Sequence, residues 1–512
     1  MFIKTYGCAV LGISATIITI ETNVIQGLNC HLVGLPDSTI KEAIHRVESS
    51  IKLLGYFFPR QKLIINLAPA DIRKEGSAYD LPIALSVIYA SDQIKFPNFD
   101  EFVIMGELSL DGILRPIKGA LPIAIEAKKQ GFKSIILPLE NALEASVVNE
   151  IQVYGVKNLN EAIQFLAKRR ELQPIKADLQ KFFNDKNNTF DVDFSSVQGQ
   201  EGVKRALEVA AAGGHNVIMI GPPGAGKTMM AKRLPSILPP LTLTEALETT
   251  KIHSVAGKLS HNKTLIATRP FRNPHHTISN AALVGGGSNP QPGEISLAHN
   301  GILFLDELPE FNRMALEVLR QPLEDRKVLI SRAKWAVEFP ANFMLIASMN
   351  PCPCGYFNHP TKDCICKPST VQKYLNKISG PLLDRFDIQI EIQPVNFEEM
   401  TSRIHYEESS IIRERVINAR EIQINRFKNY SQIFHNSMMG SELVKEFCDL
   451  NESCQALLKV AMEKLELSGR AYDRIIKVSR TIADLDNSFE IQAFHVAEAI
   501  NYRNLDRSAW GV

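Results

Sequence analysis

A glycine-rich loop between an apolar run and a helix-like run constrains this chain more than any other feature. The apolar residues 216–220 come before the loop and residues 229–234 come after it, and the loop itself reads Gly221, Pro222, Pro223, Gly224, Ala225, Gly226, Lys227 and Thr228. Strand, glycine loop and helix in this order form a phosphate-binding loop, in which backbone N–H groups surround nucleotide phosphates. We therefore predict that Lys227 contacts the β/γ oxygens of a nucleoside triphosphate and that Thr228 ligates Mg²⁺. A glycine-rich turn without a ligand is the alternative.

Two later strands are predicted to complete the nucleotide site. The apolar run 301–307 ends in Asp306 and Glu307, and the run 341–350 ends in Asn350. A buried parallel strand delivers its last side chain to the carboxyl edge of the sheet, so Asp306 is expected to hold Mg²⁺ and Glu307 to activate water. Asn350 is expected between these acids and the γ-phosphate. Two acids at a helix N-terminus are the alternative interpretation of Asp306 and Glu307.

A single arginine follows an apolar turn in residues 380–387. This is Arg385. Arginine is suited to stabilising the charge that develops on transferring phosphoryl oxygens. We therefore count Arg385 among the catalytic candidates.

Length and composition bound the protein class. With 512 residues the chain is too long for one core, which predicts two to four domains. Its hydrophobic content of 45% and net charge of +1 are those of an ordinary globular protein and give no overall attraction to nucleic acid or anionic lipid. Any polyanion must therefore meet a local patch. The pattern of cysteines and the lack of a run of about 20 apolar residues predict a cytoplasmic protein without a membrane contact.

The chain divides into four parts by pattern. Residues 1–167 alternate strand-like and helical runs, and residues 168–190 form a polar linker. Residues 191–395 hold the nucleotide core, and residues 396–512 are mostly helical in pattern. The prediction is an α/β multidomain protein with a parallel sheet in its core.

The glycine loop, the Asp-Glu strand, the Asn-ended strand and the later arginine together resemble an AAA+ ATPase. The long motifs 269–276, 293–299, 307–311 and 350–355 resemble its magnesium-chelatase-like branch. The whole chain is similar to the ComM/YifB family, which implies a hexameric ring linked to DNA branch migration in natural transformation. Those motifs stand in this chain as Arg269-Pro-Phe-Arg-Asn-Pro-His-His276, Gly293-Glu-Ile-Ser-Leu-Ala-His299, Glu307-Leu-Pro-Glu-Phe311 and Asn350-Pro-Cys-Pro-Cys-Gly355.

The resemblance also implies roles for individual residues of this chain. Asn350 becomes the sensor-1 residue, and Arg385 becomes a finger supplied to a neighbouring subunit. Arg470 becomes the sensor-2 arginine of a helical lid, with Arg474 as a competitor one helical turn away. A solvated helix charge is the alternative for Arg470.

Residues 105–117 and 134–141 resemble the proteolytic domain of Lon. The position expected for the catalytic lysine holds Leu121, and the position expected for the serine holds Ala78, with Ser77 one residue away. A serine without a base to take its proton is a poor nucleophile. We therefore expect a Lon-protease-like but non-catalytic domain that acts as a scaffold or contacts DNA.

Two basic segments are candidate DNA contacts. Residues 326–339 have hairpin character, with Arg332, Lys334 and Trp335 at one end, where cations and an aromatic ring can grip a nucleic acid strand. A solvated hairpin edge protected by lysine is the alternative. The second segment contains Arg269 and Arg272, for which phosphate contact and core structure are both open. The histidines that follow them, His275 and His276, are expected to point in opposite directions on an extended segment.

Four cysteines cluster near the nucleotide site. Two Cys-x-Cys pairs, Cys352 with Cys354 and Cys364 with Cys366, supply the four thiolates of a tetrahedral structural Zn²⁺ site. Their spacing departs from the commoner Cys-x2-Cys pattern. A tight loop of reduced thiols is the alternative.

These features favour an ATPase that moves on single-stranded, duplex or branched DNA, with ATP and Mg²⁺ as cofactors and a ring, most simply a hexamer, as the assembly. The alternative is a chelatase-type or chaperone-type ATPase that remodels a protein partner. Porphyrin metallation is less favoured, since no integrin-like domain is expected after the core.

Overall fold

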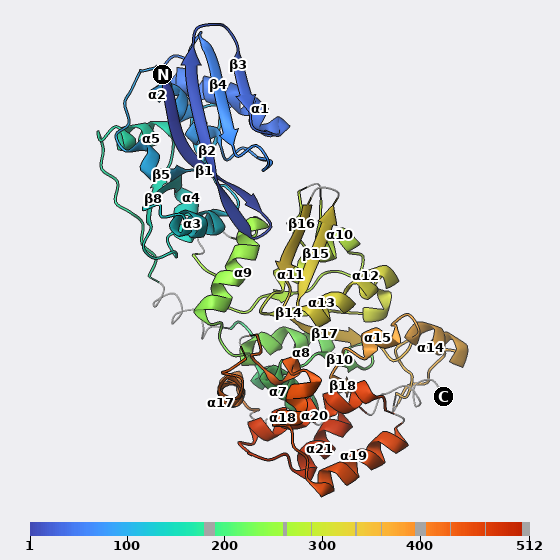
Figure 1. Cartoon of the computed structure of the whole chain (residues 1–512). Helices are drawn as coiled ribbons and strands as arrows, with labels where there is room; N and C mark the ends of the chain where they lie inside the picture. Colours follow the sequence, from blue (N-terminus) through green and yellow to red (C-terminus); the bar gives the residue numbers. More distant parts are fainter. Residues whose placement is uncertain are drawn as a thin grey trace.

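The protein is elongated, and its three folded regions follow one another along the chain (Figure 1). The computed structural model describes residues 1–178, 190–259, 264–287, 289–332, 335–359, 361–394, 406–430, 432–465 and 467–503. Residues 179–189 of the predicted linker lie outside these ranges. The first residues of the linker lie against the N-terminal region, where the Ile175 N–H donates to the Val153 carbonyl oxygen at 2.9 Å.

The N-terminal region is a mixed sheet of seven strands with helices packed on it. The strand order is β3-β4-β2-β1-β5-β8-β9. The sheet contains β1 (Phe2–Leu11), β2 (Ser14–Ile25), β3 (Cys30–Val33), β4 (Lys62–Ala68), β5 (Phe102–Ile104), β8 (Ser134–Pro138) and β9 (Gln152–Val156). The helices are α1 (Ser38–Leu53), α2 (Asp80–Ala90), α3 (Ala120–Lys129), α4 (Leu139–Ala145) and α5 (Leu159–Leu166), and β6 (Glu107–Leu108) pairs with β7 (Leu114–Arg115).

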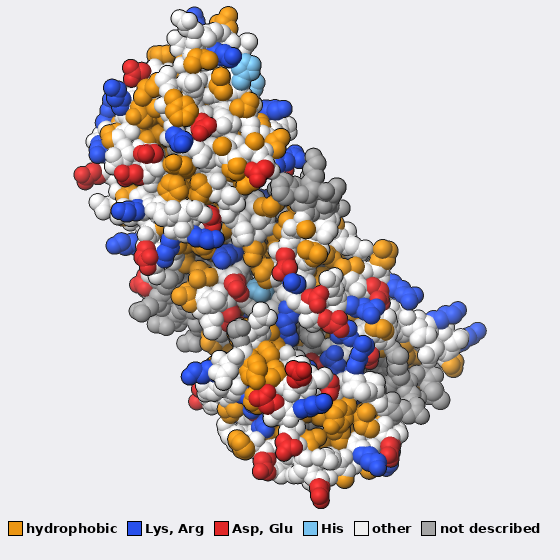
Figure 2. All heavy atoms as spheres, viewed as in Figure 1, with side chains coloured by type: hydrophobic (Ala, Val, Ile, Leu, Met, Phe, Trp, Pro, Cys, Tyr) orange, Lys and Arg blue, Asp and Glu red, His pale blue; other side chains and the backbone are white. Residues whose placement is uncertain are grey.

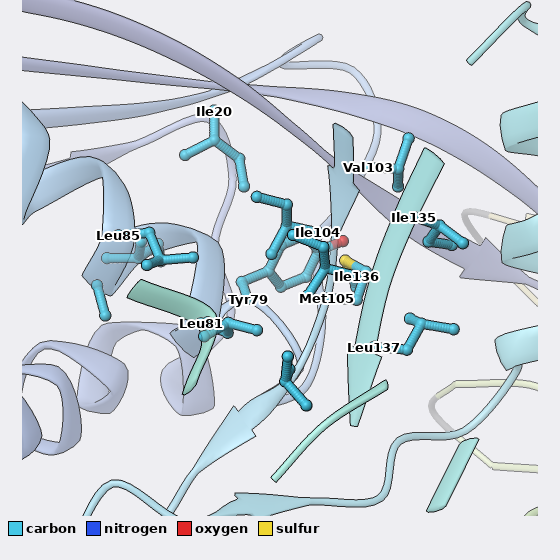
Figure 3. Close-up of a cluster of buried hydrophobic side chains, with 14 of the residues drawn as sticks. Ile20, Tyr79, Leu81, Leu85, Val103, Ile104, Met105, Ile135, Ile136 and Leu137 are labelled. Carbon is cyan, nitrogen blue, oxygen red and sulfur yellow. The ribbon is translucent and has the colours of Figure 1, made fainter. Parts of the chain in front are cut away.

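Along β2 and β4 of this sheet, buried residues alternate with more exposed ones, which sets the face that packs on the core. In β4 every second residue is buried, as expected for a strand with one face on the core. Between the sheet and α2 lie Tyr79, Ile104, Met105 and Ile136, all almost fully buried (Figure 3). The Tyr79 hydroxyl donates to the Cys8 carbonyl oxygen at 2.9 Å, so its one polar atom is satisfied inside the core.

A second, fully parallel sheet of five strands forms the centre of the molecule. Its order is β11-β14-β17-β10-β18. Its strands are β10 (Val217–Ile220), β11 (Phe271–Arg272), β14 (Ile302–Leu305), β17 (Met344–Met349) and β18 (Ile388–Glu391). All residues of β10, β14 and β17 are buried, which explains why they read as continuous apolar runs.

Helices and two small hairpins surround this sheet. The helices are α7 (Glu201–Gly213), α8 (Lys227–Arg233), α9 (Leu243–Val255), α10 (Asn280–Val284), α11 (Glu294–Leu297), α12 (Arg313–Val318), α13 (Arg320–Asp325), α14 (Pro368–Leu375) and α15 (Gly380–Leu383). One hairpin pairs β12 (Gly285–Gly286) with β13 (Gln291–Pro292), and the other pairs β15 (Lys327–Arg332) with β16 (Trp335–Pro340).

The C-terminal region is helical. Its helices are α17 (Ser409–Arg426), α18 (Ser441–Phe447), α19 (Glu452–Lys464), α20 (Gly469–Leu485) and α21 (Ala493–Asn501). A buried ionic cluster joins α17 to α20, in which Arg426 and Arg480 both donate to the fully buried carboxylate of Asp484. Asn436 donates to the same carboxylate at 2.8 Å.

The N-terminal region contacts the core through α9. The Ser254 hydroxyl donates to Glu144 Oε1 at 2.5 Å, and the Gly119 N–H donates to the Ser254 carbonyl oxygen at 3.3 Å. Leu121 lies in a small apolar cluster with residues of the core, namely Leu241, Ala246 and Leu265. Figure 1 shows α9 between the two regions and the β15–β16 hairpin beside the end of β1 and β2.

The predicted parallel sheet of the core and the helical C-terminal region are confirmed, as are the strands after which the glycine loop, the two acids and Asn350 follow. The boundaries at residues 167, 190 and 395 stay predictions. None of the helices in the described ranges has the length and apolar character needed to cross a membrane. Charged side chains of both signs are interspersed over the face shown in Figure 2, in line with the net charge of +1.

Candidate functional site

The glycine loop 221–228 joins the carboxyl end of β10 to the start of α8. Gly224 and Gly226 have φ of +80° and +87°, a left-handed conformation that favours glycine. The Lys227 ammonium group bends back over the loop, with Nζ 2.7 Å from the Gly221 carbonyl oxygen and 2.9 Å from that of Pro222. It also donates to Asn350 Oδ1 at 3.1 Å. The loop is thus closed on the end of β17, which lies beside β10 in the sheet.

The Asp306 carboxylate lies at the same edge of the sheet. The Thr228 hydroxyl donates to Asp306 Oδ2 at 2.6 Å, and the Ser348 hydroxyl donates to Asp306 Oδ1. A hydroxyl and a carboxylate are oxygen ligands of the kind Mg²⁺ prefers, so Thr228 and Asp306 fit a shared magnesium ion. The structure therefore brings four predicted residues together, namely Lys227, Thr228, Asp306 and Asn350.

Glu307 stands next to this group in a special backbone conformation. Its φ is +54°, which is uncommon for a residue with a side chain, and its carboxylate is more than half exposed. His276 Nδ1 lies 3.4 Å from Glu307 Oε2. The exposure of this carboxylate leaves it accessible to a water molecule.

Burial lowers the pKa of Lys227, while the nearby carboxylates of Asp306 and Glu307 oppose the shift. A buried ammonium group with carbonyl partners gains most from a polyanion placed against it. The electrostatics of the loop therefore suit a phosphate group.

Arg385 lies at the opposite edge of the same sheet. The Asn216 side chain, just before β10, donates to the Arg385 carbonyl oxygen at 3.0 Å. The Arg385 guanidinium group contacts Glu324, and its buried Nε has no hydrogen-bond partner among the described residues. Because β10 and β18 are parallel, the glycine loop and Arg385 lie at opposite ends of β10.

Arg470 and Arg474 of α20 also lie near this end of the sheet, where β10 and β18 begin. Arg474 contacts the buried Asp387 carboxylate, which accepts as well from the Asn216 N–H at 3.2 Å. Although burial of Asp387 opposes its ionisation, Arg474 and His215 hold its pKa well below its usual range. Arg474 is therefore an anchor of α20, whereas Arg470 is largely exposed at 3.8 Å from Asp384.

Arg269 and Arg272 have partners inside the protein. Arg269 donates to the carbonyl oxygens of Pro239 and Asn300 at 2.7 Å and 2.8 Å, and it pairs with Glu245. Arg272 forms a two-point ion pair with Glu294, with N···O distances of 2.6 Å and 2.7 Å. Both arginines therefore have structural partners in this conformation, and a DNA contact by either stays a prediction.

The other DNA candidates sit at the end of the β15–β16 hairpin. The antiparallel pairing ends at Arg332 and Trp335, so the predicted hairpin is confirmed in its backbone. Lys334 and the side chains of Arg332 and Trp335 lie outside the described residues.

One expectation about the histidines is wrong. The rings of His275 and His276 do not point in opposite directions but lie 4.1 Å apart with an interplanar angle of 33°. The reason is local: β11 ends at Arg272, and the histidines belong to a turn, where the alternation of an extended strand no longer applies.

The four clustered cysteines converge. The Sγ atoms of Cys352, Cys354, Cys364 and Cys366 all lie within 4.8 Å of one another. Within the described residues this is the one group of at least three His, Cys, Asp or Glu side chains arranged to hold a metal ion. Four thiols are compatible with Zn²⁺.

The N-terminal region shows no serine–lysine arrangement at the positions where the Lon resemblance expects one. The Ser77 hydroxyl donates to Glu107, and Leu121 is fully buried against the core. Leu121 therefore packs the two regions together.

Sequence reasoning missed two residues of the site. Ser348 is a lone polar residue in an apolar strand and stands two positions before Asn350, so period-2 alternation places both on one side of β17. This alternation is visible in the sequence and could have identified Ser348. His276 approaches Glu307 from a turn far away in sequence, and no local pattern indicates this contact.

Comparisons with known proteins agree with this arrangement. Residues 193–400 match the family described as "Magnesium chelatase, subunit ChlI", residues 20–141 match "Subunit ChlI of Mg-chelatase", and residues 406–503 match "Magnesium chelatase, subunit ChlI C-terminal". The competence protein ComM of Haemophilus influenzae is 43% identical over 511 residues, which cover 98% of this chain and 97% of that protein. The uncharacterized protein YifB of Escherichia coli is 43% identical over 504 residues, covering 98% and 96%. Lon protease 2 of Bacillus subtilis is 30% identical over 189 residues, covering 31% of this chain and 33% of that protein, which supports the Lon-like interpretation.

Proposed function

Because the chain belongs to the ComM/YifB family of magnesium-chelatase-like AAA+ ATPases, we propose that it couples ATP hydrolysis to movement on DNA as a ring helicase. Branch migration of recombination intermediates is the work that we propose for it. The name of the ComM relative, a competence protein, supports DNA as the substrate.

One observation carries the proposal of a ring. The phosphate loop and Arg385 lie at opposite edges of one sheet, so an arginine that acts on phosphate must serve a neighbouring copy. Subunits joined edge to edge in this way make head-to-tail contacts, which close into a ring when the rotation permits. The hexamer is the ring size that we propose.

The proposed chemistry assigns one task to each residue of the site. Lys227 neutralises the β/γ-phosphate oxygens, Thr228 and Asp306 hold Mg²⁺, and Glu307 takes the proton of the attacking water. Asn350, which Lys227 already contacts, orients the γ-phosphate. Arg385 and the exposed Arg470 stabilise the transition state in the next subunit.

The β15–β16 hairpin is the proposed DNA contact. It is inserted in the chain between β14 and β17, and its base leads directly into the start of β17, the strand that presents Asn350 at its other end. Val328 and Phe339 near the base and Ile330 and Val337 nearer the tip are buried in the apolar cluster on the sheet. Near the base, Lys327 is paired with Glu338 at 2.9 Å. In the sequence, the cations at the turn of the hairpin are Arg332 and Lys334.

The test measures ATP hydrolysis with and without single-stranded, duplex and four-way DNA. We expect stimulation by DNA, and the Arg332→Ala/Lys334→Ala variant should lose much of it while basal hydrolysis is unchanged. The salt dependence of DNA binding should fall by about two units of slope, because two phosphate contacts are removed. Lys327→Ala is the matched control, since this lysine lies on the same hairpin but is already paired.

An ATPase that none of these DNA substrates stimulates would refute the helicase proposal and favour the remodelling of a protein partner. ATP and Mg²⁺ are the cofactors of the proposed reaction. Zinc at the cysteine cluster is proposed as a structural component.

A further inference from the structure

The segment 351–367 connects Asn350 to α14 without a helix or strand among its described residues. Few of its side chains are buried, and Ile365 is 87% exposed. A loop of this length in a compact domain needs something other than an apolar core to hold it. The one fully buried cysteine of the cluster, Cys352, stands at its start, two residues after Asn350.

The geometry of the four thiols fits a tetrahedral metal ion. Cys352 Sγ lies 3.3 Å from Cys354 Sγ and 3.7 Å from Cys364 Sγ, and the distance from Cys354 Sγ to Cys364 Sγ is 3.6 Å. Four sulfurs at about 2.3 Å from a central Zn²⁺ are about 3.8 Å apart.

The cysteine loop also lies directly on the phosphate loop. A Cβ built on Gly355 would lie 2.4 Å from Cδ of Pro223, so the Gly355 backbone lies against the Pro223 ring without room for a side chain. At the start of the cysteine loop, Asn350 Oδ1 accepts a hydrogen bond from Lys227 Nζ. The cysteine loop thus contacts the glycine loop at Pro223 and continues the strand that presents Asn350.

We propose that Cys352, Cys354, Cys364 and Cys366 bind one Zn²⁺ ion, and that this metal-held loop positions Asn350 and the phosphate loop for ATP hydrolysis. Zinc is thereby a positioning element of the nucleotide site and takes no part in the chemistry. The positioning role rests on the proposed ATPase reaction, while the metal site does not.

Metal analysis of the full-length protein tests the site itself. In reducing, chelator-free buffer the protein should carry about one zinc per chain, and Cys364→Ser/Cys366→Ser should carry none. Cys30→Ser, which changes an exposed cysteine outside the cluster, should keep the metal. Cobalt(II) added in place of zinc should give the visible absorption of tetrahedral thiolate coordination, and the double variant should lack it. A protein without zinc, or with zinc in the double variant, overturns the metal site.

Hydrolysis and nucleotide binding, measured on the same samples, test the positioning role. The double variant should still bind a fluorescent ATP analogue but hydrolyse ATP about 100-fold more slowly, because a misplacement of about 1 Å has that effect. Circular dichroism of the double variant checks that the helices and sheets persist. Unchanged hydrolysis in a folded, zinc-free variant overturns the positioning role. Zinc in a wild-type protein that never hydrolyses ATP instead refutes the proposed function and leaves the metal site intact.

Discussion

Mixing two inactive variants tests whether Arg385 acts in the nucleotide site of its own subunit or in that of a neighbouring subunit. On its own, Arg385→Ala should bind ATP normally and hydrolyse it about 1,000-fold more slowly, because a finger acts on the transition state. Glu307→Gln should bind ATP and fail to hydrolyse it. Each variant keeps the group that the other lacks.

The length of β10 separates Arg385 from the glycine loop of its own subunit. The Arg385 carbonyl oxygen contacts Asn216, and Lys227 Nζ contacts the Gly221 carbonyl oxygen. These two strand positions are separated by roughly 16 Å at about 3.3 Å per residue. An arginine side chain does not span this distance, so Arg385 cannot reach the phosphates bound by its own subunit.

The expected recovery follows from random assembly. In an equal mixture, about one quarter of the head-to-tail interfaces join an intact Glu307 to an intact Arg385. With independent sites, the mixture should therefore hydrolyse ATP at about a quarter of the wild-type rate. The assay is steady-state phosphate release, with subunit exchange verified by energy transfer between labelled chains.

The matched control is a mixture of Lys227→Ala with Glu307→Gln. Both residues lie at the same edge of the sheet, so no interface in this mixture contains a complete site and no activity should return. Recovery in this control, or no recovery with Arg385→Ala once exchange is verified, would refute action between subunits.

Three single contacts can be tested by substitution. Lys227→Ala should abolish nucleotide binding, because the cation that closes the glycine loop is lost, and normal titration with a fluorescent ATP analogue would show that the site is assigned wrongly. Gly355→Ala should retain zinc but slow hydrolysis, since its Cβ would overlap Pro223, whereas Gly131→Ala, with the same φ of +84° and open space around it, should leave hydrolysis unchanged. Asp484→Ala should destabilise the helical region by about 3–5 kcal/mol, because Arg426 and Arg480 would lose their buried partner; a denaturation midpoint equal to that of wild type would contradict this.

Local patterns predicted the nucleotide edge well. The glycine loop, Asp306 and Asn350 each follow a continuous apolar run, and parallel strands place the ends of such runs together. The order of residues along the chain also indicates on which side of the sheet Arg385 lies relative to the glycine loop. This arginine precedes its strand while the glycine loop follows one, and that difference already separates them across the sheet.

Contacts between segments that are distant in the sequence could not be predicted from local sequence patterns. Arg269 and Arg272 look like a basic patch in the sequence, but Glu245 and Glu294 neutralise them in the fold. The convergence of the cysteines was likewise open, because the spacing of two Cys-x-Cys pairs does not fix the path of the loop between them. Such partners depend on tertiary packing, which periodicity does not encode.

The separation of Lys227 and Arg385 also has a consequence for assembly. A two-fold dimer uses the same patch on both partners, whereas an interface between these two edges uses a different patch on each. An open row of subunits therefore leaves one edge with Lys227 and one edge with Arg385 unmatched, and only closure matches every edge. If hydrolysis needs both residues, the specific activity must rise with protein concentration and fall on dilution, because each working site belongs to two chains.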